Sequence, residues 1–238
     1  RAQVLLERVL PSWGEFFRTT LHMEGAYCAV YLDPRPETAG RLLESLEPVD
    51  LPGTMRFIAR SVRGELELTR GNVRTAALIQ RVSLRYAGNW RSILGSGSQW
   101  ELYILSMCLV TDVELSPDDA VELDTRAVRA RATSLLREIL SDPAPRQRDI
   151  PTLMAFAAAV GLSTVAAEDA GSDRRAVGGE LVATALAVGT NQTCRLLSHD
   201  YLRSRTERLD ARALTQAEER IRSLDRGGLV AHAADLAG

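Results

Sequence analysis

The sequence predicts an all-α protein, and three observations carry that prediction. Apolar residues recur at helical spacing through most of the 238 residues. Alanine and leucine dominate while aromatic residues make up only 5% of the chain, a composition that favours helices over sheets. The 9 prolines cluster between the periodic segments, where prolines end or begin helices. We therefore expect antiparallel helices along the whole chain.

The segment 55–87 gives the clearest local prediction, two helices joined by one tight turn. Gly71 can adopt the left-handed conformation that ends a helix, and Asn72 can cap the next one. Gly64 is a small residue that lets the two helices approach closely. The residues at helical spacing are Phe57, Ile58, Val62, Leu66 and Leu68 before the turn, and Val73, Ala77, Leu78, Val82, Leu84 and Tyr86 after it.

The elements before this unit form a second hairpin. A short helix over 1–10 is followed by a restart at Pro11 and a long helix over 14–32. The Asp-Pro-Arg-Pro sequence at 33–36 ends that helix, and the helix over 37–46 packs back against it.

After the central unit, 95–98 reads Gly-Ser-Gly-Ser and is the most linker-like stretch of the chain. The next helix, 99–110, is apolar almost all round and belongs in the middle of a stack. Ser116 followed by Pro117 and two aspartates is a strong helix start, and we expect that helix to continue to Leu140.

A polar connection over 141–148 leads to a fourth hairpin. Its first helix begins at Asp149-Ile150-Pro151 and runs to about Ala167, a turn follows at 169–173, and its second helix covers 174–188. Gly189-Thr190-Asn191 is expected to end this helix and to cap the next one. Three more charged helices, 192–208, 211–224 and 229–237, are suited to capping the end of a stack.

The charged residues exclude several kinds of chemistry. All 29 basic residues are arginines, so these residues supply no Walker A lysine, Schiff base or lysine general base. The net charge of −2 argues against a large nucleic-acid surface. Four arginines line the 117–140 helix and form either a binding stripe or a solvated face. We favour the solvated face, because nearby acids offset Arg126, Arg129, Arg131 and Arg137, namely Asp118, Asp119, Glu122, Asp124 and Glu138.

No catalytic, cofactor or metal site is predicted. Cys28, Cys108 and Cys194 are isolated and odd in number, so we expect buried thiols in a reducing cytoplasm. His199 and Asp200 are sequence neighbours and point to different faces of a helix, which makes a poor dyad. His22 and His232 have no evident partner. Asn191 opens a formal glycosylation triplet that has no meaning in a cytoplasmic protein.

The chain also carries no sign of a membrane or secretory segment. Its most apolar run, 153–167, is shorter than the ~18 residues that suggest a membrane span, and no signal peptide is visible. Because the chain opens on Arg1 rather than Met, we expect it to be a piece of a longer protein.

The hairpin around Gly71 resembles the tetratricopeptide repeat (TPR), which has a small residue in its first helix and a Gly-Asn or Gly-Asp turn. The resemblance implies that similar hairpins stack, since one hairpin cannot bury its apolar faces alone. We therefore expect 1–238 to be one TPR-like α-solenoid with a C-terminal helical cap, with a subdivision near 95–98 left open. By the usual repeat geometry, the side chains of Ser61, Glu65 and Thr69 would face a partner groove.

The residues from Asp149 onward resemble the C-terminal helical region of actinobacterial transcriptional regulators of the AfsR/SARP and ATPase-linked LuxR type. The features are DIPTLMAFAAAVGLSTVAAEDAGSDRRAVGGELVATALA and the close ERIRSLDRGGLVAHAADLA. The resemblance implies a non-enzymatic sensor arm that binds a protein or peptide, including other domains of the same regulator. From the charge, the isolated cysteines and the lack of a signal peptide, we expect no cofactor, no direct nucleic-acid contact and a cytoplasmic location. The stretch 214–224 also resembles the first helix of a LuxR-type DNA-binding domain, but too few residues follow to build one.

A second hypothesis stays open at this point. The helix over 99–110, apolar on all sides, would also suit a compact all-helical enzyme or ligand-binding bundle with an apolar pocket. A deep enclosed cavity would favour this bundle over the solenoid.

Overall fold

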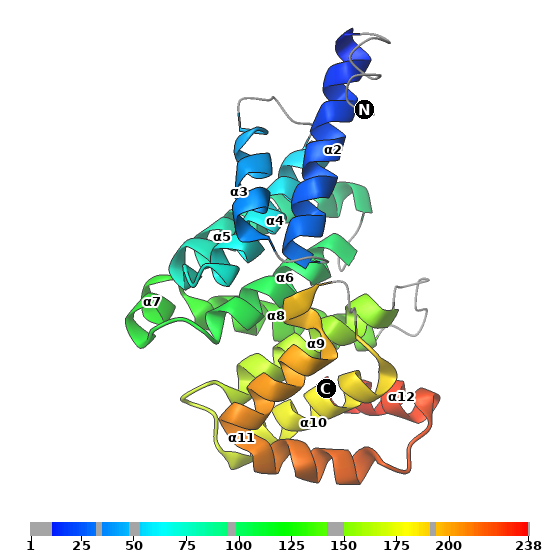
Figure 1. The fold of residues 1–238 in the computed structure, drawn as a ribbon. Coiled ribbons are helices and arrows are strands. Elements are labelled where there is room, and N and C mark those ends of the chain that lie inside the picture. The colour runs from blue at the N-terminus through cyan, green and yellow to red at the C-terminus, as the bar shows by residue number, and fades with distance from the viewer. Residues whose placement is uncertain are drawn as a thin grey trace. The chain divides into compact units, whose positions relative to one another are not determined.

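The structure is a computed structural model that describes residues 11–31, 35–47, 53–94, 99–141, 150–190 and 194–237. The prediction of an all-α fold is confirmed, because all regular elements in these ranges are helices (Figure 1). They are α2 (Pro11–Tyr31), α3 (Pro36–Glu44), α4 (Gly53–Thr69), α5 (Val73–Leu94), α6 (Gln99–Asp112), α7 (Pro117–Glu122), α8 (Thr125–Leu140), α9 (Ile150–Val165), α10 (Ser172–Val188), the 3-10 helix η1 (Arg195–Leu197), α11 (His199–Ile221) and α12 (Arg226–Ala237).

Contacts divide the chain into two compact units, Arg1–Ser83 and Leu84–Gly238. The division falls inside α5, whereas the subdivision that we considered at 95–98 lies outside the described residues. That 1–238 form a single repeat domain stays a prediction.

In the first unit, α2, α3 and α4 pack around a small apolar core. Gly25 brings α2 close to α3, since a Cβ atom at that position would lie 3.1 Å from Leu42 Cδ1. His22 Nδ1 lies 2.7 Å from Ser45 Oγ and links the same two segments. The core consists of Met23, Ala26, Ala29, Val30, Ala39, Leu43, Leu46, Val62 and Leu66.

The helix stop at Gly71, between α4 and α5, forms as the sequence predicts, whereas the Asn72 side chain bonds back to α4. Gly71 has φ of +81°, the left-handed conformation that ends α4. The Asn72 side chain donates from Nδ2 to Glu67 Oε2 at 2.8 Å, and Arg70 Nη1 lies 3.1 Å from Glu67 Oε1. Glu67, which is almost fully buried, therefore ties both turn residues back to α4.

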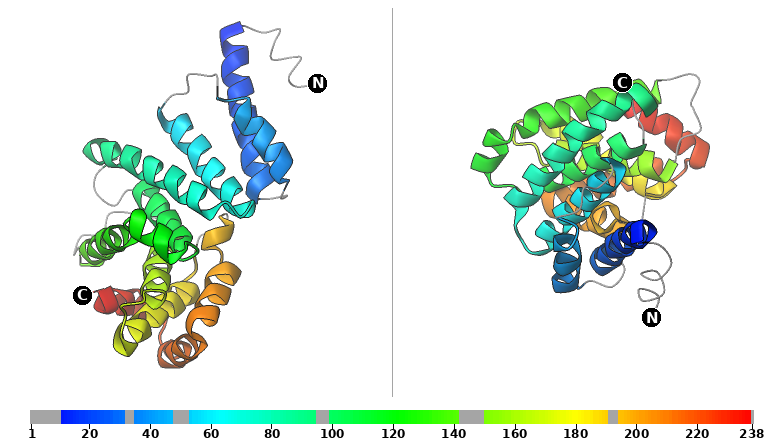
Figure 2. Two further views of the ribbon diagram at one scale, coloured as in Figure 1. Left: turned by 90° about the vertical axis from the view of Figure 1, so that its left-hand side faces the viewer. Right: turned by 90° about the horizontal axis from the view of Figure 1, so that it is seen from above.

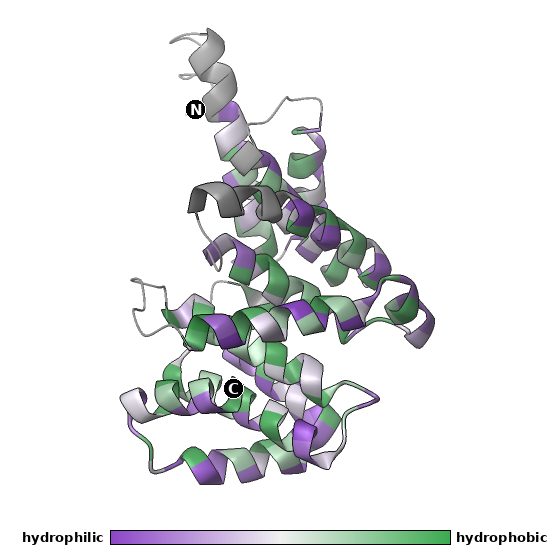
Figure 3. Ribbon diagram, turned by 180° about the vertical axis from the view of Figure 1, so that it is seen from behind, coloured by the Kyte–Doolittle hydropathy of each residue, from purple (hydrophilic) through white to green (hydrophobic). Residues whose placement is uncertain are grey.

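The second unit is built around α9 and α10, whose side chains are the most thoroughly buried. In α9 the whole stretch 152–163 is buried, which explains its long apolar run. Helices α6 and α8 pack against α9, and α11 packs against α10. Helix α12 lies beside both α10 and α8 (Figure 2). Along α8, hydrophilic and hydrophobic residues alternate (Figure 3), as expected for a helix with one covered face.

Two glycines let α9 and α10 come into direct backbone contact. A Cβ atom at Gly161 would lie 2.5 Å from Gly178 O, and one at Gly178 would lie 2.7 Å from Gly161 O. Gly179, the next residue of α10, meets Ala213 of α11 in a similar way, with a Cβ distance of 3.1 Å. The small residues that the sequence shows in this hairpin thus allow close packing on two sides of α10.

One predicted helix boundary is wrong, and another is confirmed. The helix expected from Ser116 to Leu140 breaks after α7, because Asp124 takes a left-handed conformation with φ of 49° and starts a new helix. The break predicted between the helices 192–208 and 211–224 is confirmed, because non-helical dihedral angles at Asp210, φ of −159° and ψ of 82°, interrupt α11. The first half of α11 begins at His199, after η1. Asp210 Oδ1 accepts a hydrogen bond from Ala213 N at 2.9 Å, so this residue caps the second half.

Other expectations are partly met. Cys108 and Cys194 are buried as predicted, but Cys28 is exposed, because it lies on the face of α2 away from Ala26 and Ala29. The predicted helix over 1–10 and the triplet at Asn191 lie outside the described residues. Within the ranges given above, no helix combines the length and apolar character needed to cross a bilayer.

Candidate functional site

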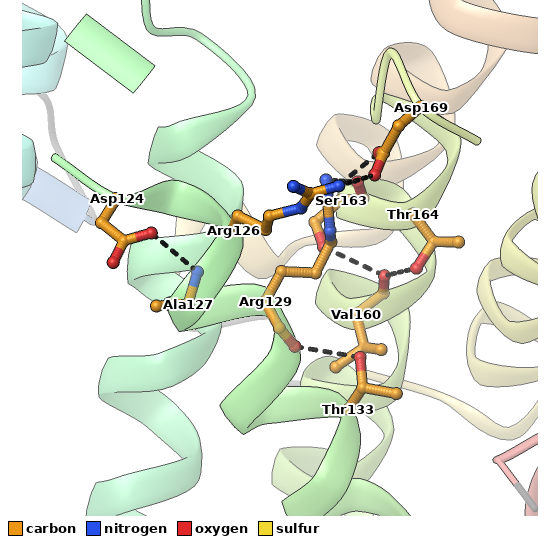
Figure 4. Close-up of polar contacts among 9 residues, drawn as sticks. All are labelled: Asp124, Arg126, Ala127, Arg129, Thr133, Val160, Ser163, Thr164 and Asp169. Atoms are coloured by element: carbon orange, nitrogen blue, oxygen red, sulfur yellow. Dashed lines mark hydrogen bonds and ion pairs between the residues drawn. The ribbon is translucent and has the colours of Figure 1, made fainter. Parts of the chain in front are cut away.

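The most distinctive polar cluster of the second unit joins α8 to the turn between α9 and α10. Arg126 Nη2 lies 2.8 Å from Asp169 Oδ2, and Arg129 Nη2 lies 3.3 Å from Asp169 Oδ1 (Figure 4). Arg129 Nη1 also donates to Ser163 O at 3.4 Å, near the negative end of α9. One carboxylate therefore receives two guanidinium groups.

Asp124 determines where these arginines lie. Its left-handed conformation, which aspartate tolerates better than most residues, separates α7 from α8. Its Oδ1 then accepts from Ala127 N at 3.2 Å and caps α8 (Figure 4). As a result Arg126 stands in the first turn of α8, and Arg129 follows three residues later on the same face.

Asp169 is positioned by the turn that carries it. Ala167 and Ala170 on either side are buried, and Ala170 N donates to Ala167 O at 3.1 Å. The exposed Asp169 side chain is thereby held in the turn, and Gly171 follows as the N-cap of α10.

The two arginines lower the pKa of Asp169 below its ordinary value of 3.8. The hydrogen bond from Arg126 is the larger cause, followed by the positive charge of Arg129, and both favour the ionised carboxylate. The bridge is therefore fully formed above the ordinary pKa and is lost as the pH falls through the lowered pKa.

The other two arginines of α8 have separate partners. Arg131 Nη2 lies 2.9 Å from Oε1 of Glu101, a fully buried residue of α6. Arg137 Nε donates to Ala237 O at 2.7 Å, at the end of α12. The partners given for these arginines thus come from α6, α12 and the turn between α9 and α10, and the offset of their charge by acids of the same segment stays a prediction.

Arg126, Arg129 and Arg137 line one groove, which we call the arginine groove. It has a volume of about 620 Å³ and lies among α8, α9, α10 and α12. Arg174 of α10 adds a fourth guanidinium, against two carboxylates, those of Asp169 and Asp173. Its other lining residues are Ala130, Thr133, Ser134, Leu136, Val160, Thr164, Val177, Leu181, Leu236 and Ala237.

A second pocket, the α7 pocket, lies on the other side of the Asp169 bridge. Its volume is about 550 Å³, and it shares Arg126, Arg129 and Asp169 with the arginine groove. Acidic residues predominate in this pocket, whereas arginines predominate in the arginine groove, because four carboxylates here face the two arginines. The remaining acids are Asp112, Asp124 and Glu168, and the apolar wall includes Leu109, Val113, Leu115, Val121 and Ala166.

The residues predicted to face a partner groove lie in the first unit. Ser61 and Glu65 are buried, and Thr69 is exposed. Ser61 Oγ donates to Phe57 O and Thr69 Oγ1 to Glu65 O, each at 3.0 Å. Both hydroxyl groups therefore bond within α4, and their contact with a partner stays a prediction.

The sequence did not predict a second polar cluster in this unit, formed around Glu180. His232 Nε2 of α12 lies 2.7 Å from Glu180 Oε1, and Arg220 Nη2 of α11 lies 2.8 Å from Glu180 Oε2. Glu180 belongs to α10 and is buried, with only 9% of its surface exposed. Because its two partners come from α11 and α12, the cluster connects three helices. Glu180 lies among apolar residues of α10, and because a buried carboxylate needs partners, this position is the sequence feature that indicates such a cluster. His199 Nε2, in contrast, contacts the backbone oxygen Leu186 O.

The described part of the chain contains no group of three or more His, Cys, Asp or Glu side chains that could hold a metal ion. The cluster that the geometry brings together is instead an arginine-rich groove with an apolar floor. Comparisons with protein-family models, with curated proteins and with solved structures find no match for this chain.

Proposed function

We propose that the chain is a non-catalytic module for protein–protein interaction, a sensor arm of a bacterial transcriptional regulator. The observation that supports this best is the arginine groove. Its four guanidinium groups surround a floor of apolar side chains, and grooves between packed helices with convergent polar groups are common binding sites. The partner is a protein or peptide, in which we include other domains of the same regulator.

The regulator class rests on the sequence resemblance to the AfsR/SARP and ATPase-linked LuxR proteins described above. We also propose a cytoplasmic location, which the isolated cysteines support. The helical hairpins α2–α3, α4–α5 and α9–α10 are compatible with a TPR-like α-solenoid, which remains our proposal for the arrangement of the whole chain.

Site-specific photo-crosslinking tests this function. A photoreactive phenylalanine replaces Val177, which lines the arginine groove and is 38% exposed, and the chain is irradiated in cells of its host. The same replacement at Leu209, which is 41% exposed and lines neither pocket, is the matched control.

We expect one protein to be crosslinked from position 177 and not from position 209. The purified partner should bind the chain directly, and Val177→Trp should abolish binding because the indole fills the groove. If the two positions crosslink the same proteins equally, the groove is not a binding site and the proposal fails.

The α7 pocket favours the alternative function, a helical bundle that binds a small ligand. Its volume lies within the range typical of ligand sites, and Leu109 and Val113 contribute to an apolar wall. Helix α6 itself is covered by α8, α9 and η1, so its apolar surface faces protein. A fragment screen by ligand-observed NMR tests this alternative: Val113→Trp should abolish the binding of any fragment that occupies this pocket.

A further inference from the structure

We propose that the arginine groove binds an acidic, amphipathic helical segment of the partner protein. This inference rests on the proposed function and adds the chemistry of the partner. Four properties of the groove support it: its charge, its free hydrogen-bond donors, its apolar lining and its length.

The charge of the groove favours carboxylates. Asp169 is already engaged by Arg126 and Arg129 (Figure 4). Arg174 makes no hydrogen bond or ion pair with the residues that the structure describes. Arg137 uses Nε for Ala237 O, which leaves its two terminal nitrogens for a ligand. Two guanidinium groups can thus receive carboxylates, an arrangement that often gives bidentate hydrogen bonds.

Two of the three hydroxyl groups along the groove are engaged within their own helices, and the third belongs to the exposed Ser134. Thr133 Oγ1 donates to Arg129 O at 3.0 Å, and Thr164 Oγ1 donates to Val160 O at 2.8 Å (Figure 4). Guanidinium groups are therefore the main donors open to a ligand, which selects for anionic groups over neutral hydroxylated ones.

The apolar lining of the groove favours a ligand that carries apolar groups beside its carboxylates. Leu136, Val160 and Leu181 form a buried floor, while Val177 and the half-buried Leu236 remain accessible. An occupant that presents an apolar stripe would remove Val177 and Leu236 from water. A purely charged ligand would leave them exposed.

The length of the groove matches a short helix. Arg126 and Arg137 are eleven residues apart on α8, close to three helical turns, so they lie on one face and about 16 Å apart along the axis. A bound helix of three to four turns spans that length. Acids spaced three or four residues apart on its edge would then follow the arginines, with leucine or phenylalanine toward the floor.

A nucleic acid fits these features less well. Asp169 and Asp173 lie in the same groove and would repel a phosphate backbone, and the apolar floor offers phosphates no partner. The whole chain carries a net charge of −2, whereas surfaces that bind nucleic acids are usually strongly basic.

The experiment is a selection from a random 16-residue peptide library displayed on phage, with the full chain as bait and the Val177→Trp variant as a parallel bait. We expect the peptides lost with Val177→Trp to contain two or more Asp or Glu at helical spacing beside Leu, Ile or Phe. Affinity of a selected peptide should fall at least about tenfold in the double variant Arg137→Glu/Arg174→Glu. Arg212→Glu/Arg222→Glu, on α11 and at its C-cap, makes the same change of charge outside the groove and should have little effect.

The outcomes separate this inference from the proposed function. If the peptides lost with Val177→Trp are neutral or basic, the acidic-helix inference is wrong. It is also wrong if a single-stranded oligothymidine, offered to the same chain as a nucleic-acid probe, binds at the arginines and no acidic peptide does. Neutral or basic peptides would leave the interaction function standing. If no peptide depends on Val177, and crosslinking from that position also fails, the interaction function itself is wrong.

Discussion

Replacing Gly161 with alanine tests the packing on which the second unit depends. The new Cβ atom would lie 2.5 Å from Gly178 O and 3.0 Å from Leu181 Cβ. An ordinary contact begins near 3.4 Å, so α9 and α10 would have to separate by about 0.9 Å in a close-packed interior. The obstacle is a backbone oxygen, which cannot rotate away as a side chain could.

The magnitude follows from two opposing effects. Overpacking a core costs about 1–3 kcal/mol, and we expect the upper end because two central helices must shift. Alanine returns about 1 kcal/mol through its higher helix propensity. The net loss is about 2 kcal/mol, which corresponds to a fall in Tm of about 4–8 °C for a chain of this size.

The assay is thermal unfolding followed by circular dichroism at 222 nm. The control is Gly171→Ala in the same hairpin, where the added Cβ meets no atom within 4 Å and φ is −66°. That variant should remain within about 1 kcal/mol of the wild type, the size of an N-cap effect. An unchanged or raised Tm for Gly161→Ala would show that α9 and α10 do not pack at this distance.

Three further predictions concern single side chains. Gln80→Met should raise the free energy of unfolding by about 1 kcal/mol, because neither amide atom of the buried Gln80 has a hydrogen-bond partner among the described residues; lower stability in urea would contradict this. The pKa of Asp169, measured by NMR titration of its carboxyl carbon, should lie below 3.8 and rise in Arg126→Leu; an equal pKa in both proteins would mean that the hydrogen bond does not form in solution. Glu180→Gln should cost about 2 kcal/mol, since His232 and Arg220 contact different oxygens of Glu180 and glutamine replaces one of these with an NH2 donor; an unaltered urea midpoint would rule out that cluster.

The helices themselves were largely predictable because their signals are local. Gly71 adopts the left-handed conformation expected of a helix stop, and Ser116 accepts from Asp119 N at 3.2 Å as an N-cap should. Asp124 was missed because an aspartate in a helix-compatible sequence does not reveal that it will take φ of 49°. The local pattern favoured continuing the helix, and the break became visible only in the folded chain.

The candidate site was less predictable, because its parts come together only through tertiary packing. Arg126 and Asp169 are far apart in sequence, and nearer acids offered a simpler account of the arginine charge. The pairing of Glu180 with His232 likewise depends on α12 folding back onto α10. Helical spacing assigns each residue to a face of its own helix, but it does not say which other helix that face meets.

A charge exchange across the arginine groove tests the central claim most directly. Calorimetry would compare an acidic peptide selected on the wild-type chain with its inverted counterpart, in which each Asp or Glu is replaced by Lys. Each peptide is titrated into the wild type and into Arg137→Glu/Arg174→Glu. We expect the wild type to prefer the acidic peptide and the double variant to prefer the inverted one, because the same contacts are restored with opposite signs. If both proteins rank the two peptides in the same order, the arginines of this groove do not recognise the partner.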